Sequence, residues 1–80
     1  MKIPRNITGR ELENLLKLYG YKISRQRGSH IRLTTNQKGT HHITIPAHKP
    51  LKIGTLSSIL NDIARHFNIS KEELIKEIFK

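Results

Sequence analysis

The chain has 80 residues, which is enough for one small domain spanning residues 1–80. Apolar residues make up 35% and charged residues 26%, as expected of a globular domain rather than a disordered segment. No apolar run approaches the roughly 20 residues of a membrane span, and residues 1–5 lack the apolar core of a secretory signal. Cysteine is absent, which excludes disulfides and thiol chemistry and fits a cytoplasmic protein.

The charge is distributed unevenly along the chain. The net charge is +9, from 15 Lys and Arg against six Asp and Glu. Residues 1–52 hold eleven of the bases and two of the acids, whereas residues 53–80 hold four of each. A basic half almost free of acids indicates a polyanionic partner, either nucleic acid or an acidic protein surface. An anionic membrane fits less well, because no segment pairs basic residues with a broad exposed apolar face.

A first helix is predicted over residues 9–19. Thr8 and Glu11 have the spacing of a capping box, in which each side chain accepts a hydrogen bond from the other residue's backbone amide. Gly20 is well placed to end the helix. The apolar residues that recur at helical spacing are Leu12, Leu15, Leu16 and Tyr19.

From Tyr21 onward the apolar period changes to two, which indicates β-strands. Turns at residues 28–29 and 36–39 separate three such segments, and Pro46 ends the third. We therefore expect a three-stranded antiparallel sheet with one apolar face. If no bulge intervenes, the other face carries Lys22, Ser24, His30, Arg32, His42 and Thr44.

Two more helices follow a loop at residues 46–54. The second helix is predicted to begin at Gly54 or Thr55, and a second capping box at Ser70 and Glu73 begins the third. The apolar stripe of the second helix is Leu56, Ile59, Leu60, Ile63 and Phe67. The apolar stripe of the third helix is Leu74, Ile75, Ile78 and Phe79. Helices on one face of an antiparallel sheet give a two-layer α+β fold in the order α-β-β-β-α-α.

His30 is the strongest candidate for chemistry. It follows a tight turn on the polar face, and Arg25, Arg27 and Arg32 are near it in sequence. Repulsion from these cations favours the neutral imidazole, which can accept the proton of an RNA 2′-OH beside a scissile phosphate. The arginines would stabilise the transition state, no metal or other cofactor would be needed, and the product would be a 2′,3′-cyclic phosphate. Residue types alone also allow His30 to be an ordinary polar residue on an open sheet.

The remaining histidines give weaker signals. His41 and His42 are adjacent in a strand and so point to opposite faces, and no nearby Asp, Glu or Cys could complete a metal site. We therefore expect no bound metal. His42 shares the face of His30, and the pattern allows it either to assist His30 or to be an ordinary surface residue. His41 and His66 are expected to be surface polar residues.

A candidate phosphate-binding loop precedes the second helix. His48, Lys49 and Lys52 lie there, and the free amides at a helix start attract anions, although the helix could simply be capped at that point. No aromatic platform for reading bases is evident. The candidate RNA- or phosphate-binding residues are Arg25, Arg27, Ser29, Arg32, His42, His48, Lys49 and Lys52.

Several of these segments occur together in a known family. They are T-G-R-E-L at residues 8–12, G-S-H at 28–30, H-I-T-I-P at 42–46 followed by His48, and L-K-I-G-T-L at 51–56. Over about residues 3–67 the chain resembles the HicA, or YcfA-like, toxins of HicA/HicB toxin–antitoxin systems. Members often end soon after the second helix, so residues 68–80 form an extra C-terminal helix here. Its apolar stripe could be buried on the second helix, on a second copy or on an antitoxin.

The resemblance carries expectations that the residues alone do not give. It implies a fold similar to the double-stranded-RNA-binding domain, and an mRNA interferase with His30 as its catalytic residue. It also implies a HicB-type antitoxin that covers this site, with any contact to operator DNA made only indirectly through the antitoxin complex.

The sequence is consistent with three functions. The leading one is a metal-independent endoribonuclease neutralised by a protein antitoxin. A non-catalytic module that binds double-stranded RNA is the alternative, and a subunit that binds only an acidic protein is the third. The general acid of the leading reaction and the preferred RNA sequence are not visible in the residue pattern.

Overall fold

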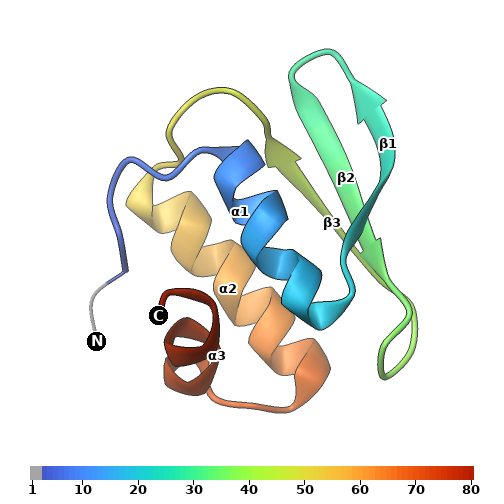
Figure 1. Ribbon diagram of the computed structural model, residues 1–80, viewed down its shortest axis with the longest axis vertical. Coiled ribbons are helices and arrows are strands. Elements are labelled where there is room, and N and C mark those ends of the chain that lie inside the picture. The colour runs from blue at the N-terminus through green and yellow to red at the C-terminus, as the bar shows by residue number, and fades with distance from the viewer. Residues whose placement is uncertain (1–2) are drawn as a thin grey trace.

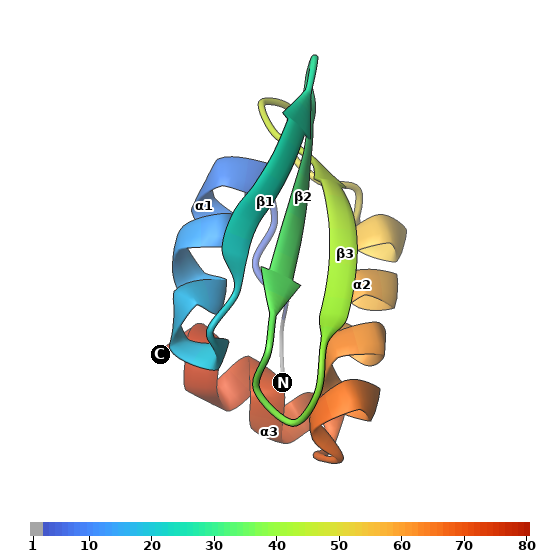
Figure 2. The same ribbon diagram turned by 90° about the vertical axis from the view of Figure 1, so that its right-hand side faces the viewer.

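The computed structural model describes residues 3–80, so Met1 and Lys2, which belong to the N-terminal segment and the basic half, lie outside the described residues. Three α-helices lie on one face of a three-stranded antiparallel sheet, and Figure 2 looks onto the open face (Figures 1 and 2). The predicted two-layer α+β fold is confirmed. The elements are α1 (Gly9–Leu15), the 3-10 helix η1 (Leu16–Tyr19), β1 (Lys22–Arg27), β2 (His30–Thr35), β3 (His41–Pro46), α2 (Ile53–Phe67) and α3 (Lys71–Ile78).

The first predicted helix is divided in two, α-helical in α1 and 3-10 in η1. Its capping box is present, because the Glu11 amide donates to Thr8 Oγ1 (3.2 Å) and the Thr8 amide donates to Glu11 Oε1 (2.8 Å). Gly20 ends η1 with φ 81°, a conformation that favours glycine. The tighter final turn leaves Leu18 59% exposed, although Leu16 is fully buried.

The sheet has the order β1-β2-β3, and a β-bulge interrupts β1. Ile23 pairs with Leu33, but the next pair joins Arg25 to Arg32, so Ser24 is an extra residue. Because side chains alternate between faces, this extra residue reverses the alternation in the rest of β1. The arginines of β1 therefore share the face of Arg32, whereas uninterrupted alternation would have placed them on the face of Ile23.

The core lies between the sheet and the helices. In β2 and β3 the predicted alternation is confirmed, since Ile31, Leu33 and Ile45 are fully buried and His30 is exposed. β1 is an exposed edge strand, which leaves Ile23 40% exposed. Within residues 3–80, no helix has the length and apolar character needed to cross a membrane.

The C-terminal helix packs inside the domain. Leu74, Ile75 and Ile78 of α3 are buried in the same apolar cluster as the residues of α2. The Glu73 amide donates to Ser70 Oγ (3.0 Å), as predicted for the start of this helix. Of the three surfaces on which this stripe could be buried, the fold uses the second helix.

Candidate active site

Residues of all three strands converge on the open face of the sheet. His30 pairs with Arg27 on one side and with Pro46 on the other. The bulge at Ser24 is what brings Arg27 to this face. The side chains enclose a shallow hollow of about 490 Å³. Its lining residues are Arg25, Arg27, His30, Arg32, His42 and Thr44.

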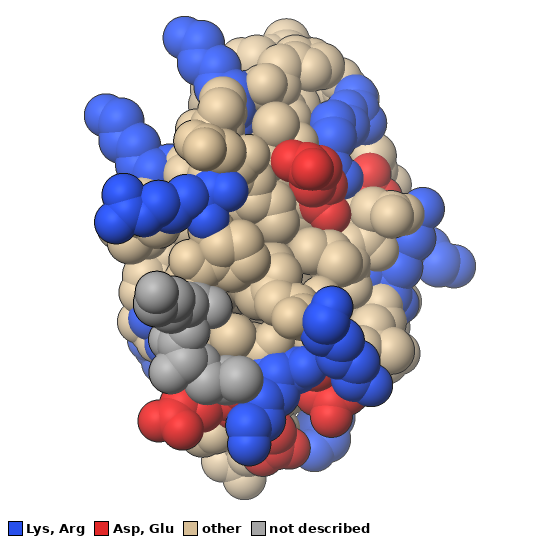
Figure 3. All heavy atoms as spheres, turned by 60° about the vertical axis from the view of Figure 1, so that its left-hand side comes forward, with Lys and Arg blue, Asp and Glu red and all other residues tan. Residues whose placement is uncertain are grey.

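The arginines of this hollow have no acidic partners. Within residues 3–80 the ion pairs are Lys17 with Glu13 and His41 with Asp62, all outside the hollow. The side of the molecule that carries the helices is different, because acidic and basic side chains are both present there (Figure 3). Guanidinium groups without carboxylate partners are well suited to bind phosphates, which they contact through paired hydrogen bonds.

His30 also borders a second hollow. This space of about 450 Å³ lies beside the loop after β3 and is lined by Ser29, His30, Pro46, His48 and Lys49. His30 is thus shared between the arginine-rich hollow of the sheet and the hollow of the loop. Ser29, His48 and Lys49, three of the candidate RNA- or phosphate-binding residues, therefore lie around the same hollow as His30.

Short backbone contacts fasten the loop to its neighbours. The Ala47 amide donates to Ser29 O (2.7 Å), and the Arg10 amide at the start of α1 donates to Ala47 O (3.0 Å). Helix and loop approach so closely that a Cβ on Gly9 would lie 1.7 Å from Pro46 O. The turn before His30 and the loop before His48 are therefore held at a fixed separation.

His42 occupies a different part of the open face. Its Nδ1 lies 2.7 Å from Thr34 Oγ1, which is itself 2.7 Å from Ser24 Oγ, so hydroxyl groups orient the ring. His42 pairs with Thr34, four positions along β2 from His30. At about 3.3 Å per residue, roughly 13 Å of strand separates the two histidines. His42 shares the predicted face but is too distant to act on the same bond as His30.

Lys52 lines neither hollow. It is the N-cap residue of α2, which begins at Ile53, one residue before the predicted start. Its backbone is extended, and no side chain caps the helix. Of the predicted phosphate-binding residues, Lys52 is the one that the structure does not bring to the edge of a hollow.

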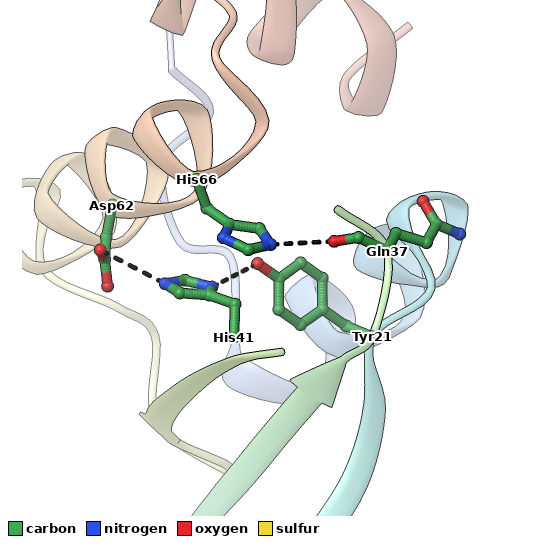
Figure 4. Close-up of polar contacts among 5 residues, drawn as sticks. All are labelled: Tyr21, Gln37, His41, Asp62 and His66. Carbon is green, nitrogen blue, oxygen red and sulfur yellow. Dashed lines mark hydrogen bonds and ion pairs between the residues drawn. The ribbon is translucent and has the colours of Figure 1, made fainter. Parts of the chain in front are cut away.

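His41 and His66 differ from the sequence prediction, because they belong to a half-buried polar cluster rather than to the surface (Figure 4). His41 Nδ1 lies 2.6 Å from the Tyr21 hydroxyl, and His41 Nε2 lies 3.4 Å from Asp62 Oδ1. The His66 ring stacks on His41 at 4.6 Å, and His66 Nε2 lies 2.9 Å from Gln37 O. The prediction that both are surface residues is therefore wrong.

This polar cluster connects the sheet to α2. Because Asp62 faces Nε2–H of His41, Nδ1 is free to accept the proton of the Tyr21 hydroxyl. Burial, and secondarily the charge of Asp62, raise the pKa of Tyr21 above its ordinary value of 10.0. The sequence did contain a signal, since His41 has the same strand parity as Ile43. Among the described residues, no three His, Asp or Glu side chains are arranged to hold a metal ion.

Comparison with known proteins gives one match. Residues 9–64 match the family model described as HicA toxin of bacterial toxin-antitoxin. The matched segment begins at the first residue of α1, ends within α2 and includes His30 and His48, whereas α3 lies beyond it. Searches of curated proteins and of solved structures give no significant match.

Proposed function

The chain belongs to the HicA toxin family of bacterial toxin–antitoxin systems, and we propose that it is a metal-independent endoribonuclease that cleaves mRNA. One observation carries the proposal: exposed His30 lies between a hollow lined by unpaired arginines and a second hollow lined by His48 and Lys49. A general base beside phosphate-binding groups is the minimum that RNA cleavage needs, because RNA supplies its own nucleophile.

In the proposed reaction, His30 is the catalytic base. Its neutral imidazole removes the proton of the 2′-OH, the 2′-oxygen forms a bond to phosphorus, and the bond to the 5′-oxygen breaks. The products are a 2′,3′-cyclic phosphate and a 5′-hydroxyl. Arg27, directly across from His30, and Arg32, on the same face, are positioned to bind the phosphate oxygens as charge accumulates.

The rest of the basic surface would bind the RNA on either side of the cleaved bond. Arg25 and His42 extend the open face along the strands by about 13 Å, which suits adjacent nucleotides of a single strand. On the other side, Ser29, His48 and Lys49 border the loop hollow. Lys52 at the start of α2 would add a more distant phosphate contact.

The family also supports a protein partner. We propose that a HicB-type antitoxin covers the open face in the bacterial cytoplasm and blocks access of mRNA to His30. The unpaired arginines favour an acidic antitoxin surface. Contact with operator DNA would come only indirectly, through the complex with the antitoxin.

The test uses a long single-stranded RNA in EDTA, with single-stranded DNA of the same sequence as control. We expect the wild type to cleave RNA alone and leave cyclic phosphate ends, and His30→Ala to be slower by about 10²–10⁴-fold. Lys76→Gln on α3, far from the open face, should keep full activity. Cleavage by His30→Ala at the wild-type rate, with an unchanged circular dichroism spectrum, would contradict the assignment.

The basic face also favours a second candidate, a non-catalytic module that binds double-stranded RNA. The unpaired arginines of the hollow are suited to contact phosphates, and such contacts do not require an imidazole. This candidate predicts that RNA stays intact, that duplex RNA is retarded in a gel, and that His30→Ala binds as well as the wild type.

A further inference from the structure

Two histidines enter the loop hollow from neighbouring turns. His30 follows Ser29, and His48 follows Ala47. The 2.7 Å hydrogen bond from the Ala47 amide to Ser29 O joins the residues that immediately precede the two histidines. His30 and His48 are therefore anchored side by side, although 18 positions separate them in the sequence.

The proposed cleavage needs a proton donor for the 5′-oxygen, because an alkoxide is a poor leaving group. The mechanism described so far does not assign one. Arg does not release its proton in proteins, and Lys, with an ordinary pKa of about 10.4, holds its own tightly near neutral pH. Imidazolium is the side chain best suited to donate a proton near pH 7. His42 is about 13 Å along the strand from His30, too far to reach the other oxygen of the same phosphate.

We propose that His48 is the general acid of the reaction, an inference that rests on the proposed ribonuclease function. The 2′-OH proton passes to His30, the 2′-oxygen binds phosphorus, and the bond from phosphorus to the 5′-oxygen breaks. The electron pair of that bond stays on the 5′-oxygen, which takes the ring N–H proton of the His48 imidazolium. Each cleavage leaves His30 protonated and His48 neutral, and exchange with water restores both.

The surroundings of His48 fit this role. The ring is exposed and, within residues 3–80, makes no hydrogen bond that would occupy its nitrogens. Its backbone is held firmly, since Ala47 is tied to both Ser29 and Arg10. Lys49 at the same hollow provides positive charge for the phosphate.

The test compares two substrates that differ in one atom. Both are the same oligoribonucleotide with a bond that the wild type cleaves, and in one of them sulfur replaces the bridging 5′-oxygen. Because a thiolate leaves without protonation, His48→Ala should lose about 10²-fold or more on the oxygen substrate and remain within about tenfold of wild type on the sulfur substrate. His30→Ala should be slow on both.

Two controls separate donation from binding and folding. Lys49→Gln should slow both substrates by the same factor, mainly through KM, because it removes only charge. The rate–pH profile of the wild type should be bell-shaped, and His48→Ala should lose the decline on the alkaline side. Circular dichroism of each variant checks the fold.

Other outcomes would overturn the inference. If His48→Ala cleaves the oxygen substrate at the wild-type rate, or loses equally on both substrates, His48 is not the donor and the ribonuclease function stands. If the wild type cleaves no RNA at all, the ribonuclease function fails and this role for His48 fails with it.

Discussion

Four of the five histidines fall into two groups that differ in what surrounds them. Near the open face, the side chains of His30 and His48 are exposed, and their rings make no hydrogen bond within residues 3–80. In the polar cluster, both ring nitrogens of His41 face partners, and His66 stacks against its ring. A proton that is committed to a neighbouring group is unavailable to a substrate. Under the proposed function, the same side chain type serves catalysis in one region and folding in the other.

The largest expected contrast is between two alanine variants, one in each region. His41→Ala should lower the free energy of unfolding by about 1–3 kcal/mol, because it leaves the Tyr21 hydroxyl without its partner and removes a half-buried ring. Below its melting temperature this variant should still cleave RNA. His30→Ala should show the opposite pattern, with a large loss of cleavage and an unchanged melting temperature.

Chemical and thermal denaturation measure stability, and single-turnover cleavage measures activity, on the same preparations. A His41→Ala protein that is as stable as the wild type, or a His30→Ala protein that melts markedly earlier, would remove the distinction between the regions.

Alkaline pH sharpens the comparison further. The pKa of Tyr21 is raised in the fold, so above pH 10 the unfolded chain loses this proton while the folded chain keeps it. This stabilisation is fully present below pH 10 and decreases above it, by at most about 1.4 kcal/mol per pH unit. Tyr21→Phe should be about 1 kcal/mol less stable than the wild type at pH 8, because it loses the bond to His41.

The difference between wild type and Tyr21→Phe should therefore narrow from pH 9 to pH 11. Urea unfolding at each pH measures it. A constant difference across this range would show that the hydroxyl of Tyr21 ionises equally in the folded and unfolded chain.

The smallest effect concerns the charges of the open face. Arg25→Gln should reduce the salt dependence of RNA binding, lowering the slope of log K against log salt by about 0.7, as expected for one lost phosphate contact to a single strand. Lys76→Gln on α3 removes the same charge on another part of the molecule. If both variants lower the slope equally, net charge rather than the open face determines binding.

The local sequence pattern predicted most of the fold. Apolar residues at periods of 3.6 and 2 defined the helices and the strands β2 and β3, because burial of one face governs both patterns. The position of His30 after its turn followed from the same alternation. The internal packing of α3 was left open, since an apolar stripe does not specify which surface covers it.

Two features of the structure depend on contacts that the pattern of apolar and polar residues does not encode. The bulge at Ser24 moves Arg25 and Arg27 to the open face, and a pairing register of this kind is set between strands. The sequence pattern does not predict the polar cluster, because the polarity of His41 suggests a surface position. Its parity matched that of buried Ile43, and a half-buried imidazole is tolerated there because Tyr21 and Asp62 satisfy its nitrogens.

The bulge makes the chemistry of the open face depend on how one strand pairs with its neighbour. If Ser24 took a regular place in the ladder, uninterrupted alternation would turn Arg25 and Arg27 toward the helices. All 15 Lys and Arg, the composition and the isoelectric point would be the same. Within such a fold, a shift of one residue in pairing register is enough to separate a surface that attracts nucleic acid from one that does not.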